Sequence, residues 1–92
     1  MDIFDQMAQS IIKEQEGVIG PVALEQAKKV SGLTVNWEKH DIEIKGNKTM
    51  VLEHLVEQYK HLFGQASVEV CKDAVRSMLV KVPKEQVPAL LQ

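Results

Sequence analysis

The chain has 92 residues, of which 45% are apolar and 26% are charged, and its net charge at pH 7 is −2. This composition is typical of a single folded domain, here residues 1–92, and lies far from the disordered class. It lacks the basic excess that nucleic-acid binding usually needs, no apolar run approaches the roughly 20 residues that span a bilayer, and the lone Cys71 excludes an internal disulfide.

The first residues contain no apolar stretch of the kind that forms a signal peptide, and Asp2 and Asp5 already carry charge there. We therefore expect a cytoplasmic protein that does not associate with membranes. Nucleic acid is likewise not expected as a partner.

The N-terminal part of the sequence predicts two helices separated by a glycine joint. Apolar residues follow the 3,4 spacing of a helix over residues 3–19, and Asp2 can cap its start. Gly20-Pro21 ends this helix. Proline is favoured in the first turn of the next helix, because its missing N–H would be unpaired there in any case. A second helix is expected over residues 21–30.

Residues 33–45 alternate between apolar and polar side chains, which predicts a β-hairpin. The residues expected on its apolar face are Leu33, Val35, Trp37, Ile42 and Ile44. Because an isolated hairpin is only marginally stable in water, this face must lie against the helices or against another copy of the chain.

A second pair of helices is expected after the hairpin. Asn47 can cap a helix over residues 48–63, Gly64 ends it, and a further helix is predicted over residues 65–82. Pro83 starts a short tail, residues 83–92, which has room for one or two more helical turns.

The two helical pairs correspond to each other at a constant offset of 44 residues, as from Ile19 to Phe63. The identical residues at this offset include Gly20 with Gly64, Glu25 with Glu69 and Lys28 with Lys72. We therefore predict a mostly α (α+β) fold made of two helix-Gly-helix repeats with a short β-hairpin between them. Its parts are repeat one at residues 2–30, the hairpin at 33–45, repeat two at 47–82 and the tail at 83–92.

His54, Glu57 and His61 lie at positions i, i+3 and i+7 on the polar side of the helix predicted at 48–63. Two imidazoles and a carboxylate are suitable ligands for a divalent metal, and His40 would supply a third imidazole. The two helical histidines are about 10.5 Å apart along the axis, which is long for one ion. The pattern leaves open both a metal- or small-ligand-binding sensor and a solvated helix face, and no resident cofactor is predicted.

Cys71 falls on the apolar face of the helix predicted at 65–82, where a thiol behaves as a small hydrophobic group. A DNA-binding helix-turn-helix is a second alternative, although the helix at 21–30 would present a face of mixed charge to the bases. No acid–base or nucleophile pair can be placed, so no enzymatic activity is predicted.

The segment Ile19-Gly20-Pro21-Val22-Ala23, with the short helix after it, resembles the Ile-Gly-Pro-x-Ala helical segments at the ends of various bacterial signalling and regulatory proteins. The second copy departs from this pattern, because Gln65 replaces the proline. The resemblance implies an interaction or regulatory role and assigns no active residues.

Apolar surface beyond what a small monomer hides is the most direct indication of function. We therefore predict a small non-catalytic module for protein–protein interaction or regulation. Its partner would be itself, as a homodimer or larger assembly, or another protein. The residues expected to mediate association are Val35, Trp37, Ile42, Ile44, Leu90 and Leu91.

Overall fold

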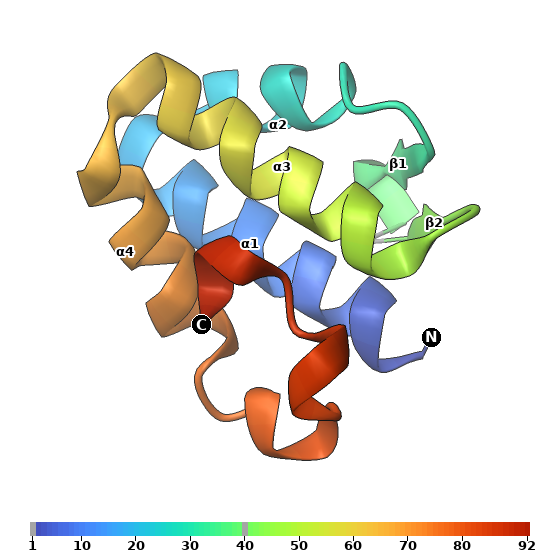
Figure 1. Ribbon diagram of the computed structural model, residues 1–92. Coiled ribbons are helices and arrows are strands. Elements are labelled where there is room, and N and C mark those ends of the chain that lie inside the picture. The colour runs from blue at the N-terminus through green and yellow to red at the C-terminus, as the bar shows by residue number, and fades with distance from the viewer. Residues whose placement is uncertain (1, 40) are drawn as a thin grey trace.

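The computed structural model describes residues 2–39 and 41–92. Its helices and strands are α1 (Ile3–Ile19), α2 (Val22–Ala27), β1 (Leu33–Asn36), β2 (Asp41–Ile44), α3 (Lys48–Phe63) and α4 (Gln65–Val75). Short 3₁₀ turns occupy Trp37–Lys39, Leu79–Lys81, Lys84–Gln86 and Ala89–Leu91. The fold is mostly helical with one two-stranded antiparallel sheet, as predicted (Figure 1). None of the helices in the described ranges is long and apolar enough to cross a membrane.

Side-chain caps set the start of the two long helices. The Asp2 carboxylate accepts a hydrogen bond of 2.9 Å from the Asp5 amide at the start of α1. The Asn47 side-chain oxygen accepts one of 3.0 Å from the Met50 amide at the start of α3. Each cap satisfies an amide that the first turn of a helix leaves unpaired, so both helices begin where the sequence predicts.

The two glycine joints have the same backbone geometry. Gly20 has φ 74° and ψ −155°, and Gly64 has φ 77° and ψ −165°. Gly20 N–H donates to the Glu16 carbonyl at 2.9 Å, and Gly64 N–H donates to the Lys60 carbonyl at 2.8 Å. Positive φ favours glycine, because a side chain would be strained there. Each joint therefore turns the chain directly from one helix into the next.

Two buried side chains tie the helical pairs together across the core. The Gln15 amide of α1 donates to the Ser67 carbonyl of α4 at 2.9 Å. The Tyr59 hydroxyl of α3 donates to the Ala23 carbonyl of α2 at 2.7 Å. Tyr59 follows Gln15 by 44 residues and Ser67 follows Ala23 by the same number, so the two ties join equivalent positions. The two ties therefore connect α1 with α4 and α3 with α2 at positions that correspond at the 44-residue offset.

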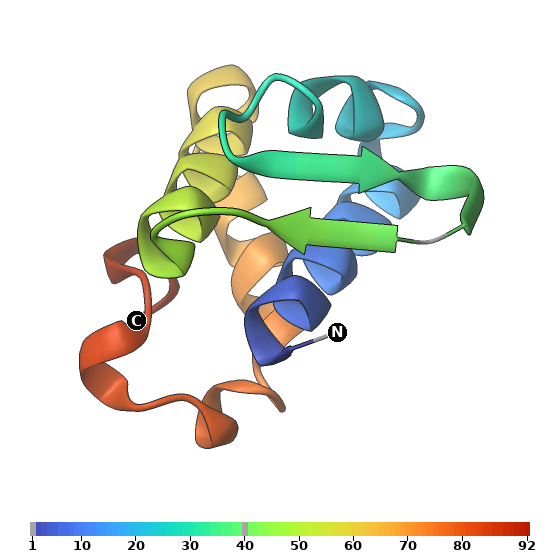
Figure 2. The same ribbon diagram turned by 90° about the vertical axis from the view of Figure 1, so that its right-hand side faces the viewer.

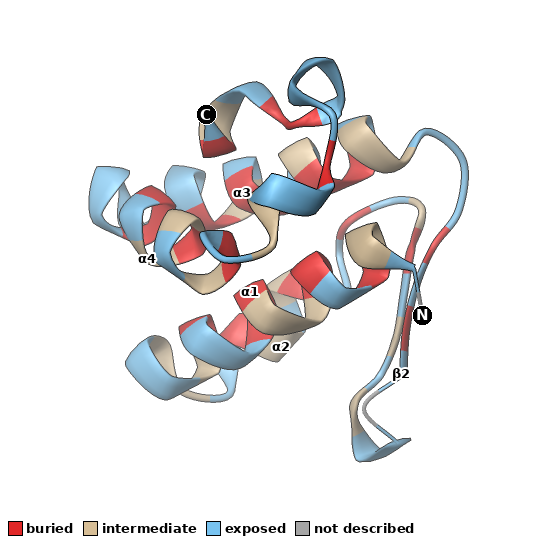
Figure 3. Ribbon diagram, turned by 90° about the horizontal axis from the view of Figure 1, so that it is seen from below, coloured by how far each residue is buried: buried red, intermediate tan, exposed pale blue. Residues whose placement is uncertain are grey.

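The hairpin lies across one side of the helices, with α1 and α3 behind it (Figure 2). Its register pairs Leu33 with Ile44 and Val35 with Ile42, so these four side chains share one face. Leu33, Ile42 and Ile44 belong to the core, where buried residues of the helices also gather (Figure 3). The apolar face of the hairpin therefore packs against the helices of the same chain.

Two predicted helices are shorter than the sequence pattern indicates. α2 ends at Ala27 rather than residue 30, and tight turns then carry the chain to Gly32, where φ is 88°. α4 ends at Val75 rather than residue 82. In both places the chain leaves the helix early so that later apolar residues reach the core. The buried residues gained in this way are Val30, Val82, Val87 and Leu91.

Replacing Tyr59 with Phe tests the tie between α3 and α2. The change removes only the hydroxyl that bonds the Ala23 carbonyl, so we expect unfolding to become easier by about 1 kcal/mol. Urea denaturation monitored by circular dichroism measures the loss. Gln65→Ala is the control, because the Gln65 amide bonds only the exposed Glu69 carboxylate and should contribute much less. Equal stabilities of the wild type and Tyr59→Phe would contradict the role of the tie.

Candidate functional site

The structure divides the six residues predicted to mediate association. Ile42, Ile44 and Leu91 are buried within the chain and are not available to a partner. Their physical role is packing: the hairpin strand β2 lies against α1, and the last 3₁₀ turn lies against α3 and α4. The residues that keep part of their surface are Val35, Trp37 and Leu90. Of the predicted association residues on the hairpin, only Val35 and Trp37 therefore remain accessible to a partner.

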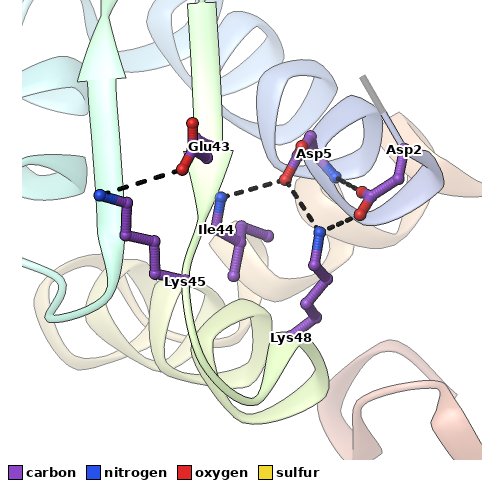
Figure 4. Close-up of polar contacts among 6 residues, drawn as sticks. All are labelled: Asp2, Asp5, Glu43, Ile44, Lys45 and Lys48. Carbon is purple, nitrogen blue, oxygen red and sulfur yellow. Dashed lines mark hydrogen bonds and ion pairs between the residues drawn. The ribbon is translucent and has the colours of Figure 1, made fainter.

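A buried carboxylate anchors β2 to α1 (Figure 4). The Ile44 amide points away from β1, because Leu33 and Ile44 form the non-hydrogen-bonded type of antiparallel pair. The Ile44 N–H donates a hydrogen bond of 3.0 Å to Asp5 Oδ1. The Lys48 ammonium lies 3.8 Å from the same oxygen and also bonds Asp2. Asp5 therefore closes one position of the outer edge of β2.

Asp2 and Lys48, which lie beside this anchor, form an ion pair that stabilises the charged form of both groups. The hydrogen bond from Lys48 lowers the pKa of Asp2 below its ordinary value of 3.8, and the bond to Asp2 raises the pKa of Lys48. The Asp2 carboxylate thus stabilises the fold above pH 3.8, and this contribution is lost as the pH falls through its lower folded-state pKa. The contribution is small because both groups contact solvent.

The outer edge of β1 borders a groove of about 590 Å³. Leu24 of α2 and Lys28, which directly follows α2, form one wall of the groove, while β1 and the following turn form the other. The lining residues of the second wall are Thr34, Val35, Asn36, Trp37 and Glu38. Two of the predicted association residues, Val35 and Trp37, therefore meet in one open groove.

A second groove, of about 500 Å³, separates α3 from the C-terminal turn. It contains Glu57 and His61 of the predicted metal set together with Leu90. Glu53 also borders it, and its carboxylate accepts the Leu90 amide at 2.9 Å. His54 is exposed outside this lining, and His40 lies outside the described residues. Within residues 2–39 and 41–92, no group of three or more His, Cys, Asp or Glu is arranged to hold a metal ion.

Cys71 lies in the core, in contact with the polar atoms of the helix ties. The Gln15 amide donates to its sulfur at 3.3 Å. Burial raises the pKa of the thiol to about 11, so the sulfur is protonated at neutral pH. A neutral, enclosed thiol has the environment of a packing residue.

Exposed apolar side chains flank the two glycine joints, and sequence reasoning missed them. Val18 is 64% exposed and Phe63 is 41% exposed, and Val22 and Leu62 beside them are also exposed. We call these four residues the joint surface. Their helical periodicity placed Val18, Leu62 and Phe63 on core-facing stripes. Their position next to a glycine joint is the signal that marks them, because the chain turns away there and leaves the last helical turn without cover.

Both joints lie at the same end of the helices. The Gln15–Ser67 bond holds the last turns of α1 against the first turn of α4, and the Tyr59–Ala23 bond does the same for α3 and α2. In Figure 1 this end is at the upper left, and in Figure 3 it is at the left, where the helix ends are exposed. The joint surface is therefore concentrated at one end of the molecule.

Comparison with protein-family models, with curated proteins and with solved structures finds no match to this chain.

Replacing Asp5 tests the anchor between α1 and β2. Asp5→Ala leaves the buried Ile44 amide without an acceptor, so we expect a loss of about 2 kcal/mol in the free energy of unfolding. Asp5→Asn keeps an oxygen at this position and should lose much less. Urea denaturation gives both values, and amide hydrogen exchange at Ile44 reports the local opening. If the two variants are equally stable, the hydrogen bond is not what holds the hairpin.

Proposed function

We propose that this protein is a non-catalytic protein–protein interaction module that self-associates through its joint surface. The observation that carries the proposal is the concentration of Val18, Val22, Leu62 and Phe63 at one end of the molecule. Large apolar side chains exposed together favour association, because contact with a partner removes their surface from water. The resemblance of residues 19–23 to segments of bacterial regulatory proteins agrees with such a role.

A second copy of the chain is the partner that this surface favours. In a twofold dimer the same patch of both copies meets, so four exposed side chains become eight in one interface. The two buried ties also hold together the helix ends that carry the joint surface. A surface that is already ordered loses little conformational entropy on binding.

The charge around the joints does not oppose contact between copies. The net charge of the chain is only −2, so long-range repulsion between two copies is weak. The residues that begin α4, Gln65 and Ala66, are uncharged and exposed beside Gly64. The centre of a dimer contact at this end would therefore be apolar with a polar border, which is the usual composition of an interface.

Charged substitutions in the joint surface test the proposal. We expect the wild type to approach the mass of a dimer as its concentration rises in sedimentation equilibrium. Val18→Asp and Phe63→Asp should each give the monomer mass over the same range, because an aspartate buried at the contact has no partner to neutralise it. Thermal unfolding of each variant checks that the fold is retained.

Val80→Asp is the matched control. Val80 is 87% exposed, more than any other large apolar residue in the described ranges, but it lies on the turn Leu79–Lys81, away from the joints (Figure 1). This variant should associate like the wild type. A wild type that stays monomeric at every concentration would contradict the proposal, as would an association that Val80→Asp weakens as much as Val18→Asp does.

A further inference from the structure

The two outer edges of the hairpin differ in their backbone hydrogen bonding. On β2, the outward amide of Ile44 is bound by Asp5. On β1, the Leu33 amide bonds the Val30 carbonyl at 3.2 Å. Val35 pairs with Ile42 in the non-hydrogen-bonded arrangement, so its N–H and C=O both point away from β2. Across the part of the chain that the structure describes, neither group of Val35 has a hydrogen-bond partner.

The β1 edge carries none of the charged residues, prolines or bulges that protect many exposed strands, although β1 is short and α2 stands beside it. Proteins block such edges with charged residues, proline or bulges. The residues of β1, Leu33–Asn36, include no charge and no proline, whereas β2 carries Asp41 and Glu43. An unpaired amide and carbonyl on an uncharged edge are the groups to which another extended chain binds.

The groove beside this edge is lined by apolar and polar side chains that an extended peptide can contact. Neighbouring strands lie about 4.8 Å apart, so a third strand beside β1 would occupy the space between β1 and α2. The groove volume of about 590 Å³ is within the range of ligand-binding clefts. Leu24 and Trp37 supply apolar contacts on either side. The lining has two charged residues, Lys28 and Glu38, and neither makes an ion pair with a described residue. The Lys28 ammonium is therefore open to a carboxylate, whereas Glu38 favours a cationic group.

We propose that the groove between α2 and β1 binds an extended peptide segment of a partner protein, which adds to the hairpin as a third strand. The peptide backbone exchanges hydrogen bonds with Val35. An apolar peptide side chain lies between Leu24 and Trp37, and an acidic one pairs with Lys28. The groove and the joint surface share no residue, although both include part of α2.

The position of α2 makes a single extended chain, and not a second folded copy, the occupant of this groove. α2 stands beside the β1 edge in every copy of the protein. Two folded copies that met edge to edge would each bring an α2 wall towards the strand of the other. An extended peptide carries no such wall and can enter along the strand.

Selection from a displayed library of short random peptides, followed by synthesis of the best binder, tests the proposal. The binder should protect the Val35 amide from hydrogen exchange in the full-length protein. Val35→Pro removes that donor and should weaken binding by about tenfold, while Val35→Thr keeps the donor and a β-branched side chain and should bind like the wild type. Proline is tolerated on an edge strand where the N–H faces outwards, and thermal unfolding confirms the fold of each variant.

Lys28→Glu provides a second test that does not touch the strand. Lys28 is exposed, so the change leaves the fold intact, and it should weaken the binder more at low salt than at high salt. Failure to select any binder, or equal binding by the wild type, Val35→Pro and Lys28→Glu, would overturn the proposal. A lower assembly mass in Val35→Pro without peptide would also overturn it, because the edge would then belong to a second copy. The mass of the Val18 and Phe63 variants tests self-association separately.

Discussion

The hydrogen bonds from Gln15 to Ser67 and from Tyr59 to Ala23 hold the two helical pairs against each other in the core. Each tie joins a helix of one pair to a helix of the other, so neither pair can shift without breaking both. The Gln15 side chain is fully buried, and its Oε1 has no partner among the described residues. Burying an unpaired acceptor is unfavourable, so packing around Gln15 must offset its cost. The hydrogen bond from Gln15 to the Ser67 carbonyl sets the register between α1 and α4.

That register decides which surfaces the molecule leaves open. It brings the two glycine joints to one end, where Val18 and Phe63 stay exposed. The hairpin packs on one side of the helices. Asp5 binds the outer edge of β2 through the Ile44 amide, so the outer edge of β1 is the one left without such a bond. The two open surfaces have different chemistry. The joint surface offers apolar area and favours another folded chain, whereas the β1 edge offers backbone groups and favours an extended one.

The sequence predicted the helix starts and turns correctly where they depend on a few neighbouring residues. The caps at Asp2 and Asn47 and the turns at Gly20 and Gly64 each depend on a few neighbouring residues, and all appear in the structure. The end of α4 at Val75 did not follow from the pattern. It depends on where Val82 and Val87 find cover, which only the tertiary structure determines.

The candidate sites were harder to predict for the same reason. Periodicity identified the apolar face of the hairpin but not its neighbour, so Ile42 and Ile44 were expected at an interface and lie in the core. Helical periodicity places Val18 on the apolar stripe of α1, but it does not reveal that the chain turns away at Gly20 and leaves this end of the stripe exposed. Asp5 resembled an ordinary first-turn acid, because its bond to the Ile44 amide joins residues far apart in the sequence.

We propose that two copies of this chain meet at their glycine joints. An isotope-filtered nuclear Overhauser experiment on a mixture of labelled and unlabelled chains, at a concentration where they associate, detects such contacts. We expect intermolecular contacts from the Phe63 ring to the methyl groups of Val18, Val22 or Leu62. Intermolecular contacts confined to Val35 and Trp37, or none from the joint surface in an associated sample, would contradict it.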